Sequence, residues 1–120
     1  MVAFSVNFYW YQPDSNLNYT HVVYDNVLLN IGSGYKSDGI FYCPKGGIYV
    51  FSVYARARVD VRAISNGMML KIKKHLSSPV VYFKDSISLV LELNAGDKIW
   101  VEYWGFMSGR YIFTGHLMNT

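Results

Sequence analysis

The run from Gly39 to Val53 constrains the fold of this chain more than any other segment. A Pro-Lys-Gly-Gly turn joins two strand-like stretches, and alternate side chains of the second stretch would point to opposite faces of a sheet. Both sets are apolar: Ile48, Val50 and Tyr54 on one face, and Tyr49, Phe51 and Val53 on the other. A strand that is apolar on both faces must be covered on both. In a small antiparallel protein one cover is the core, and the other is a second sheet edge or a second subunit. The run therefore predicts a β-sandwich that assembles.

The rest of the chain repeats this strand pattern. Apolar positions alternate with a period of two, and Val, Ile, Tyr and Phe dominate them. Turn signals separate the strand-like stretches, among them Gly32-Ser33-Gly34, Asn66-Gly67, Asn94-Ala95-Gly96-Asp97 and Ser108-Gly109. Short strands between such turns predict an all-β, antiparallel sandwich or barrel. The 120 residues fit one domain, residues 1–120.

The composition favours assembly and argues against several classes of partner. Hydrophobic residues make up 52% of the chain and aromatic residues 18%, more apolar material than so small a core needs. Self-association accounts for the excess, and an aromatic-rich ligand surface is the alternative. No apolar stretch reaches about 18 residues, so we expect no membrane span. A net charge of +3 is too weak to indicate nucleic-acid binding. The single cysteine, Cys43, is predicted to be a buried, inert thiol.

Several blocks of the sequence occur in the order of one known family. Besides the run from Gly39 to Val53, they are Val2-Ala3-Phe4-Ser5-Val6, Tyr24-Asp25-Asn26-Val27-Leu28-Leu29-Asn30-Ile31-Gly32, Gly96-Asp97-Lys98-Ile99-Trp100-Val101 and Phe113-Thr114-Gly115-His116-Leu117-Met118. Together they resemble the globular head of complement component 1q, within the tumour-necrosis-factor-like superfamily. The resemblance extends over essentially the whole chain, with a poor match in the middle, residues 56–84.

The resemblance carries its own expectations. It implies a jelly-roll topology, assembly as a homotrimer and secretion. Met1 is followed directly by a strand-like stretch, so we expect a secreted protein of this kind to have lost its signal peptide. Some relatives bind calcium, but no residue of this chain identifies such a site, and the residues themselves predict no cofactor and no metal.

The dipeptide Asn66-Gly67 between alternating strands predicts a tight type I′ hairpin. A two-residue loop determines the register, so that Ser65 opposes Met68 and Val61 opposes Ile72. One face of this hairpin is predicted to meet the core. A slip of one residue would exchange the two faces.

The other face of the predicted hairpin is mainly cationic. Its cross-strand pairs are Arg62–Lys71, Asp60–Lys73 and Arg58–His75, and Arg56 continues the row. Like charges directly opposite one another destabilise a sheet by up to about 1 kcal/mol per pair. Two interpretations remain: a solvated surface whose long side chains splay apart, or a site for carboxylated, sulfated or phosphorylated groups.

Aromatic residues next to a polar turn form a second candidate surface. Tyr103 and Trp104 precede the turn Met107-Ser108-Gly109-Arg110. Arg110 is the residue of this turn best suited to contact a ligand, and the alternative is a surface arginine with no ligand role. Aromatic rings can stack on the apolar faces of sugar rings, and they equally suit a core or a subunit interface. Both interpretations stay open for Tyr103 and Trp104, whereas Trp100 is predicted to be structural.

No catalytic constellation is present in the sequence. The three histidines, His21, His75 and His116, are scattered, and none has the spacing of a zinc-protease motif. There is no nucleophile elbow and no glycine-rich phosphate loop leading into a helix. We therefore expect a binding protein, not an enzyme.

These observations favour a secreted, trimeric, lectin-like recognition module of innate immunity that binds carbohydrates or anionic ligands such as sialylated glycans. Its predicted ligand-binding residues are Arg56, Arg58, Arg62, Lys71, Lys73, His75, Tyr103, Trp104 and Arg110. The main alternative is a trimeric extracellular signalling or scaffold ligand that binds a protein receptor. A third alternative is a structural cap that trimerises a fibrous segment.

Overall fold

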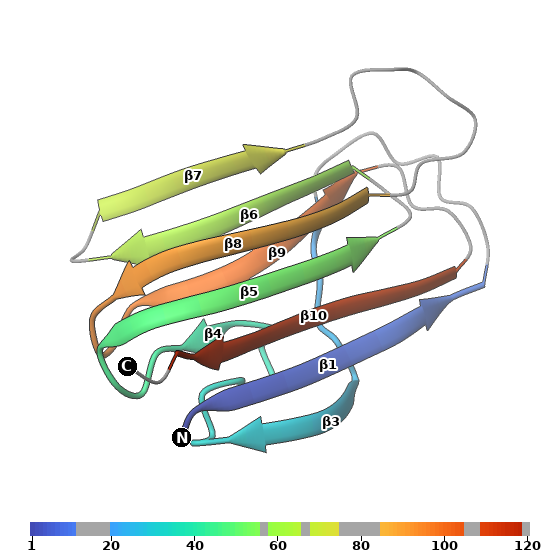
Figure 1. Cartoon of the computed structure of the whole chain (residues 1–120). Coiled ribbons are helices and arrows are strands. Elements are labelled where there is room, and N and C mark those ends of the chain that lie inside the picture. The colour runs from blue at the N-terminus through green and yellow to red at the C-terminus, as the bar shows by residue number, and fades with distance from the viewer. Residues whose placement is uncertain (12–19, 56–57, 66–67, 75–84, 105–108, 119–120) are drawn as a thin grey trace.

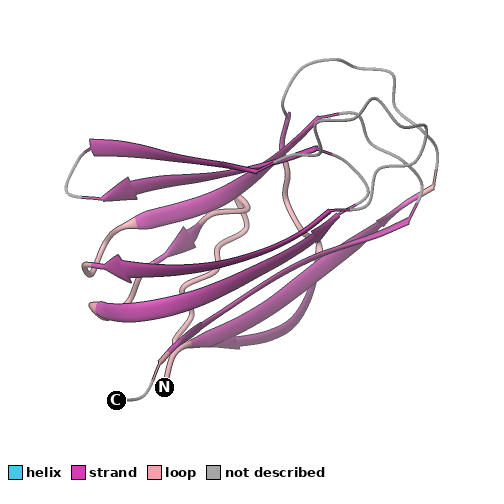
Figure 2. Ribbon diagram, turned by 45° about the horizontal axis from the view of Figure 1, so that its top comes forward, coloured by secondary structure: helices cyan, strands magenta, loops and turns pink. Residues whose placement is uncertain are grey.

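Every regular element that the structure describes is a strand (Figure 2). The computed structural model describes residues 1–11, 20–55, 58–65, 68–74, 85–104 and 109–118. In chain order the strands are β1 (Ala3–Trp10), β2 (Thr20–His21), β3 (Asn26–Ile31), β4 (Phe41–Tyr42), β5 (Gly47–Ala55), β6 (Arg58–Ser65), β7 (Met68–Lys74), β8 (Asp85–Leu93), β9 (Lys98–Trp104) and β10 (Gly109–Leu117).

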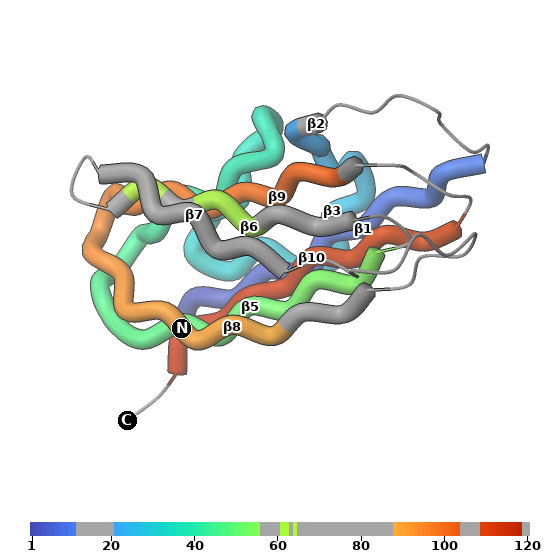
Figure 3. Tube along the Cα trace, turned by 90° about the horizontal axis from the view of Figure 1, so that it is seen from above, coloured from blue at the N-terminus to red at the C-terminus, as the bar shows by residue number. Residues whose placement is uncertain are grey.

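The strands form two facing antiparallel sheets (Figures 1 and 3). The first sheet has the order β3-β1-β10-β5-β8. The second has the order β2-β9-β6-β7, with β4 also paired to β9. The first and last strands, β1 and β10, are neighbours, and the Leu117 amide donates to the Val2 carbonyl at 2.9 Å. This confirms the all-β, antiparallel sandwich that the strand pattern predicts, and the jelly-roll topology that the family resemblance implies.

The hairpin of β6 and β7 has the predicted register. Ser65 pairs with Met68, Arg62 with Lys71 and Val61 with Ile72. Val61 is fully buried, so this face of the hairpin meets the core as expected. The turn at 66–67 and His75, the predicted partner of Arg58, lie outside the described residues.

The core is a layer of aromatic rings between the two sheets. On β5, Tyr49, Phe51 and Val53 are at most 1% exposed, which confirms the inner face of this strand. The Phe4 ring centroid lies 4.7 Å from that of Phe41 and 4.8 Å from that of Phe113. Offset and edge-to-face contacts of this kind add to the free energy of burial.

The outer face of β5 lacks such a cover within the described chain. Ile48 is 39% exposed, and Val50 and Tyr54 are half-buried. The sequence leaves two possible covers for this face, a second sheet edge or a second subunit. Among the described residues no sheet edge of this chain covers it, because the second sheet packs on the inner face of β5.

The predicted burial of Cys43 is confirmed, and Asp97 is buried as well. The Cys43 thiol is buried and donates to the Lys45 carbonyl at 3.1 Å, and its desolvation raises its pKa. Asp97 is buried in a turn, where its carboxylate accepts the Asn94 amide at 2.7 Å. Both residues therefore serve the fold.

Gly115 on β10 leaves room for two buried rings of the core, those of Phe4 and Phe51. A Cβ atom at this position would lie 2.5 Å from the Phe4 ring and 2.7 Å from the Phe51 ring. We expect Gly115→Ala to lower the free energy of unfolding by about 1–3 kcal/mol, because two buried rings would have to shift. Chemical denaturation measures the change.

Gly46→Ala is the matched control, since Gly46 is exposed and its nearest neighbour would lie 3.4 Å from an added Cβ. Equal denaturation midpoints for the two variants would contradict the proposed role of Gly115.

Candidate functional site

The outer face of the second sheet brings together four residues from three strands. His21 of β2 pairs with Glu102 of β9, and Arg62 of β6 pairs with Trp100 of β9. Trp100 and Glu102 are two residues apart on one strand, so their side chains share a face. We call His21, Arg62, Trp100 and Glu102 the outer-face cluster.

The Glu102 carboxylate connects the cluster. One oxygen lies 3.3 Å from an Arg62 guanidinium nitrogen, and the other accepts the Trp100 indole N–H at 3.1 Å. The His21 ring stacks on Trp100 with centroids 5.9 Å apart and an interplanar angle of 13°. The arrangement places an indole, an imidazole, a cation and a carboxylate next to one another on a half-exposed surface.

Asp38 extends the cluster beyond β2. The His21 Nε2 atom lies 2.9 Å from the Asp38 carbonyl oxygen. The Asp38 carboxylate accepts the Tyr42 hydroxyl at 2.6 Å and the Ile40 amide at 2.9 Å. Desolvation opposes ionisation of Asp38, but these two hydrogen bonds outweigh it and hold the pKa of Asp38 below its usual value. Asp38 is therefore a charged acceptor at neutral pH.

The cationic residues of the predicted hairpin border this cluster. Lys71 pairs with Arg62, and Lys73 pairs with Asp60, whose other neighbour is Glu102. Two lysine positions of β7 are thus neighbours of the cluster in the strand register. Such a surface offers donors for carboxylates and hydroxyls, acceptors for hydroxyls, and ring faces for apolar patches.

The structure separates the residues that the sequence proposes for ligand binding. Arg58 pairs with Trp104, so β6 brings the basic hairpin beside the end of β9. Arg110 instead lies exposed on β10 of the first sheet, opposite Tyr9. Arg56 and His75 lie outside the described residues.

Tyr103 is not available to a surface ligand. Its side chain is fully buried, and its hydroxyl shares a short hydrogen bond with the Tyr24 hydroxyl. Burial raises the pKa of both phenols. The core interpretation therefore holds for Tyr103, because residues alternate along β9 and Tyr103 points inward while Glu102 points outward.

Three residues of the outer-face cluster were not among the predicted ligand-binding residues. They are His21, Trp100 and Glu102. His21 lies far from the other two in the sequence, and Trp100 is predicted to be structural. The alternation Lys98-Ile99-Trp100-Val101-Glu102 does indicate that Trp100 and Glu102 share the outward face. Ile99 and Val101, on the other face, are fully buried. Nothing in the sequence places His21 beside Trp100.

The outer face of the first sheet has a different character. Three successive rows across its five strands contain no Asp, Glu, Lys or Arg. The rows are Ile31–Ala3–His116–Val50–Val90, Leu29–Ser5–Thr114–Ser52–Ser88 and Asn26–Asn7–Ile112–Tyr54–Ser86. We call this the charge-free face. Val90 is 64% exposed on it, so apolar surface is left open to solvent.

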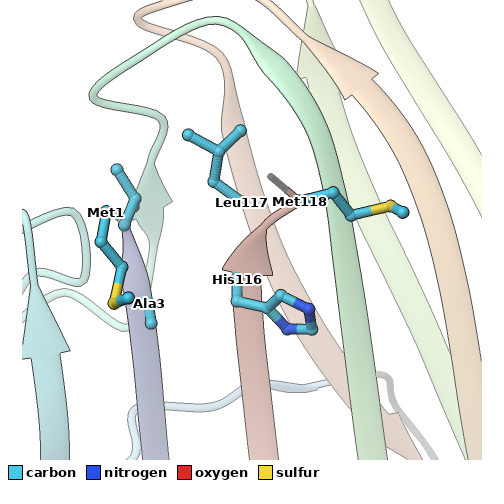
Figure 4. Close-up of a pocket in the computed structure, with 6 residues that line it drawn as sticks. Met1, Ala3, His116, Leu117 and Met118 are labelled. Atoms are coloured by element: carbon cyan, nitrogen blue, oxygen red, sulfur yellow. The ribbon is translucent and has the colours of Figure 1, made fainter. Parts of the chain in front are cut away.

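An apolar cavity of about 490 Å³ lies where both chain ends meet the charge-free face (Figure 4). It is lined by Met1, Val2, Ala3, His116, Leu117 and Met118. Ala3 and His116 belong to the first of the three rows, so the cavity continues that face. The close-up shows the His116 ring standing clear of the β10 backbone.

Two classes of site are missing from the described part of the chain. It contains no group of three His, Cys, Asp or Glu side chains placed to hold a metal ion. It also contains no helix of the length and hydropathy needed to cross a membrane.

Comparison with known proteins identifies the family. The model of the C1q domain matches residues 3–118. The chain belongs to the C1q domain family. The globular domain of zebrafish complement 1qA protein is similar in structure, with a TM-score of 0.69, 24% identity, and coverage of 99% of this chain and 98% of that one.

Other similar structures show how widely this fold is used. Murine APRIL matches with a TM-score of 0.65 and 16% identity over 96% of this chain and 99% of its own. The PRD1 vertex protein P5 matches with a TM-score of 0.64 and 14% identity over 98% and 97%. At these identities the likeness shows the fold alone, so the function must be argued from the sites.

The Arg62–Glu102 pair can be tested by a double-mutant cycle with Arg62→Gln and Glu102→Gln. We expect a coupling free energy on the order of 1 kcal/mol, because both side chains are about one-fifth exposed and solvent screens the pair. Unfolding in denaturant measures it, and added salt should reduce it.

Lys45→Gln combined with Glu102→Gln is the control cycle, since Lys45 is an exposed cation on the turn before β5. A coupling no larger than in this control would show that Glu102 does not hold Arg62.

Proposed function

We propose that this C1q domain is a trimeric, extracellular recognition module that binds carbohydrates or other anionic ligands, including sialylated glycans. In this proposal the charge-free face of the first sheet assembles the subunits. The outer-face cluster of the second sheet, with the basic hairpin beside it, contacts the ligand. The proposal assigns the domain no catalytic step.

The charge-free face supports assembly. Three rows without a formal charge across five strands are unusual for a surface that remains in water, whereas protein interfaces are depleted of charge at their centre. A second subunit would provide the missing cover on the outer face of β5. We expect three subunits because the chain belongs to the C1q domain family, and the face itself does not determine this number.

The observation that carries ligand binding is the outer-face cluster itself. Trp100 and His21 provide ring surface for the apolar C–H face of a sugar, and Asp38 provides a charged acceptor for hydroxyl groups. Arg62, Lys71 and Lys73 add positive charge for a carboxylate or sulfate.

Assembly and binding support one another in this arrangement. A single shallow site of this kind binds weakly, because few ligand atoms are buried. Three copies that engage one glycan-bearing surface bind far more tightly than each site alone. Placing the subunit contacts on one sheet leaves the other sheet open to the ligand.

Val90→Asp tests the assembly. Val90 is exposed at the edge of the charge-free face, and a carboxylate there would have to be buried unpaired in an interface. We expect the wild-type chain to be trimeric and Val90→Asp to be monomeric at the same micromolar concentration, as measured by light scattering on a sizing column.

Val23→Asp is the matched control, because Val23 is 49% exposed and lies outside the first sheet. A monomeric wild-type protein, or a trimer in all three proteins, would refute this interface.

Binding to a glycan array at low salt tests the ligand. We expect sialylated or sulfated glycans to be bound, and Lys71→Gln/Lys73→Gln to weaken binding by roughly three- to tenfold, because each exposed ionic contact contributes up to about 1 kcal/mol. Trp100→Ala should also weaken binding, including binding to neutral sugars.

Lys45→Gln is the control for loss of positive charge and should bind like the wild type. If no acidic or neutral glycan is bound by a trimeric protein, the carbohydrate proposal fails and a protein receptor or a structural role takes its place. Binding that survives both Lys71→Gln/Lys73→Gln and Trp100→Ala would mean that the ligand lies elsewhere.

A further inference from the structure

A second cavity, of about 370 Å³, lies between the segment before β3 and the turn that follows it. It is lined by Val23, Tyr24, Asp25, Val27, Tyr35, Lys36 and Ser37. This volume falls in the lower part of the range for small-molecule sites. The cavity shares no residue with the outer-face cluster or the charge-free face.

The lining of the cavity combines two exposed valines with two buried tyrosines. Val23 and Val27 are 49% and 47% exposed, so each has apolar surface available to a ligand. Tyr24 and Tyr35 are at most 5% exposed, and their phenol groups are engaged within the protein. Their hydroxyl groups are therefore not available as hydrogen-bonding partners for a ligand.

Two opposite charges lie on the cavity lining. Asp25 and Lys36 are both exposed, and among the described residues neither side chain has a hydrogen bond or ion pair. An unused carboxylate and an unused ammonium beside one apolar cavity match a ligand that carries both charges. A sugar acid or a simple amine would satisfy only one of the two by charge.

Hydrogen bonds tie together the two segments that line the cavity before any ligand arrives. The Tyr35 hydroxyl accepts the Tyr24 amide at 2.9 Å and donates to the Tyr24 carbonyl at 3.3 Å. The Asn30 side chain accepts the Tyr35 amide at 3.1 Å and donates to its carbonyl at 2.9 Å.

The segment that carries Lys36 is held as well. The Gly39 amide donates to the Lys36 carbonyl at 3.0 Å, and the Lys36 amide donates to the Ile40 carbonyl at 3.0 Å. A preformed site loses little conformational entropy on binding, which favours even a small ligand.

We propose that this cavity binds a small zwitterion, of the class of α-amino acids with an apolar side chain. Asp25 takes the ammonium group, Lys36 takes the carboxylate, and Val23 and Val27 contact the apolar side chain. The site is separate from the glycan surface proposed above and does not depend on it.

Titration of the full chain with L-leucine, followed by amide chemical shifts in NMR, tests the site. We expect millimolar binding, with shifts concentrated at residues 23–27 and 35–37. N-acetyl-leucine, which lacks the cation, and leucinamide, which lacks the carboxylate, should each bind about three- to tenfold more weakly.

Charge variants assign each contact. In Asp25→Asn the difference between leucine and N-acetyl-leucine should disappear, and in Lys36→Gln the difference between leucine and leucinamide should disappear. Lys45→Gln is the control and should keep both differences. Both variant positions are exposed, and unchanged amide spectra away from the cavity would confirm that the variants fold.

Several results would overturn this proposal: no shifts at the cavity, shifts only elsewhere, or equal binding of the three probes by the wild-type chain. Glycan binding would be unaffected by these outcomes. Failure of the zwitterion site and failure of the carbohydrate proposal are therefore distinguishable.

Discussion

The packing of Phe4 and Phe51 over Gly115 is the contact on which the rest of the structure depends. Gly115 lies on β10, the central strand of the first sheet, and the rings come from the strands on either side of it. Because no Cβ separates these rings, β1, β10 and β5 can share one aromatic layer with Phe41 and Phe113 of the core. The same three strands then carry the three charge-free rows on their opposite face.

This inner packing decides what each outer face can do. The first sheet points most of its aromatic side chains inward and presents three rows without a formal charge outward, which suits contact with another subunit. The second sheet keeps Tyr103, Val101 and Ile99 inward, so the residues between them, Trp100 and Glu102, must face out. Glu102 then binds Arg62, and this pair limits how much of the arginine's charge is left for an anion.

The hairpin shows how far local sequence can carry a structural prediction. Two residues, Asn66 and Gly67, sufficed to predict the whole register of β6 and β7, because a two-residue loop admits one pairing. The same reasoning did not find Glu102 as the partner of Arg62, since β6 and β9 are paired across a long stretch of chain. It also could not predict that Arg110 and the basic hairpin lie in different sheets, because the sheet that a strand joins depends on residues far away in the sequence.

The sequence by itself determined the strands, the two-faced apolar character of β5, the hairpin register and the family. These follow from side-chain alternation and turn chemistry, which act over a few residues, and from blocks that match in order. Only the tertiary structure decided that Tyr103 is core, that His21 stacks on Trp100, and that Asp25 and Lys36 line one cavity. Each of these depends on which strands become neighbours, and that choice is made by the packing of two whole sheets and not by any single segment.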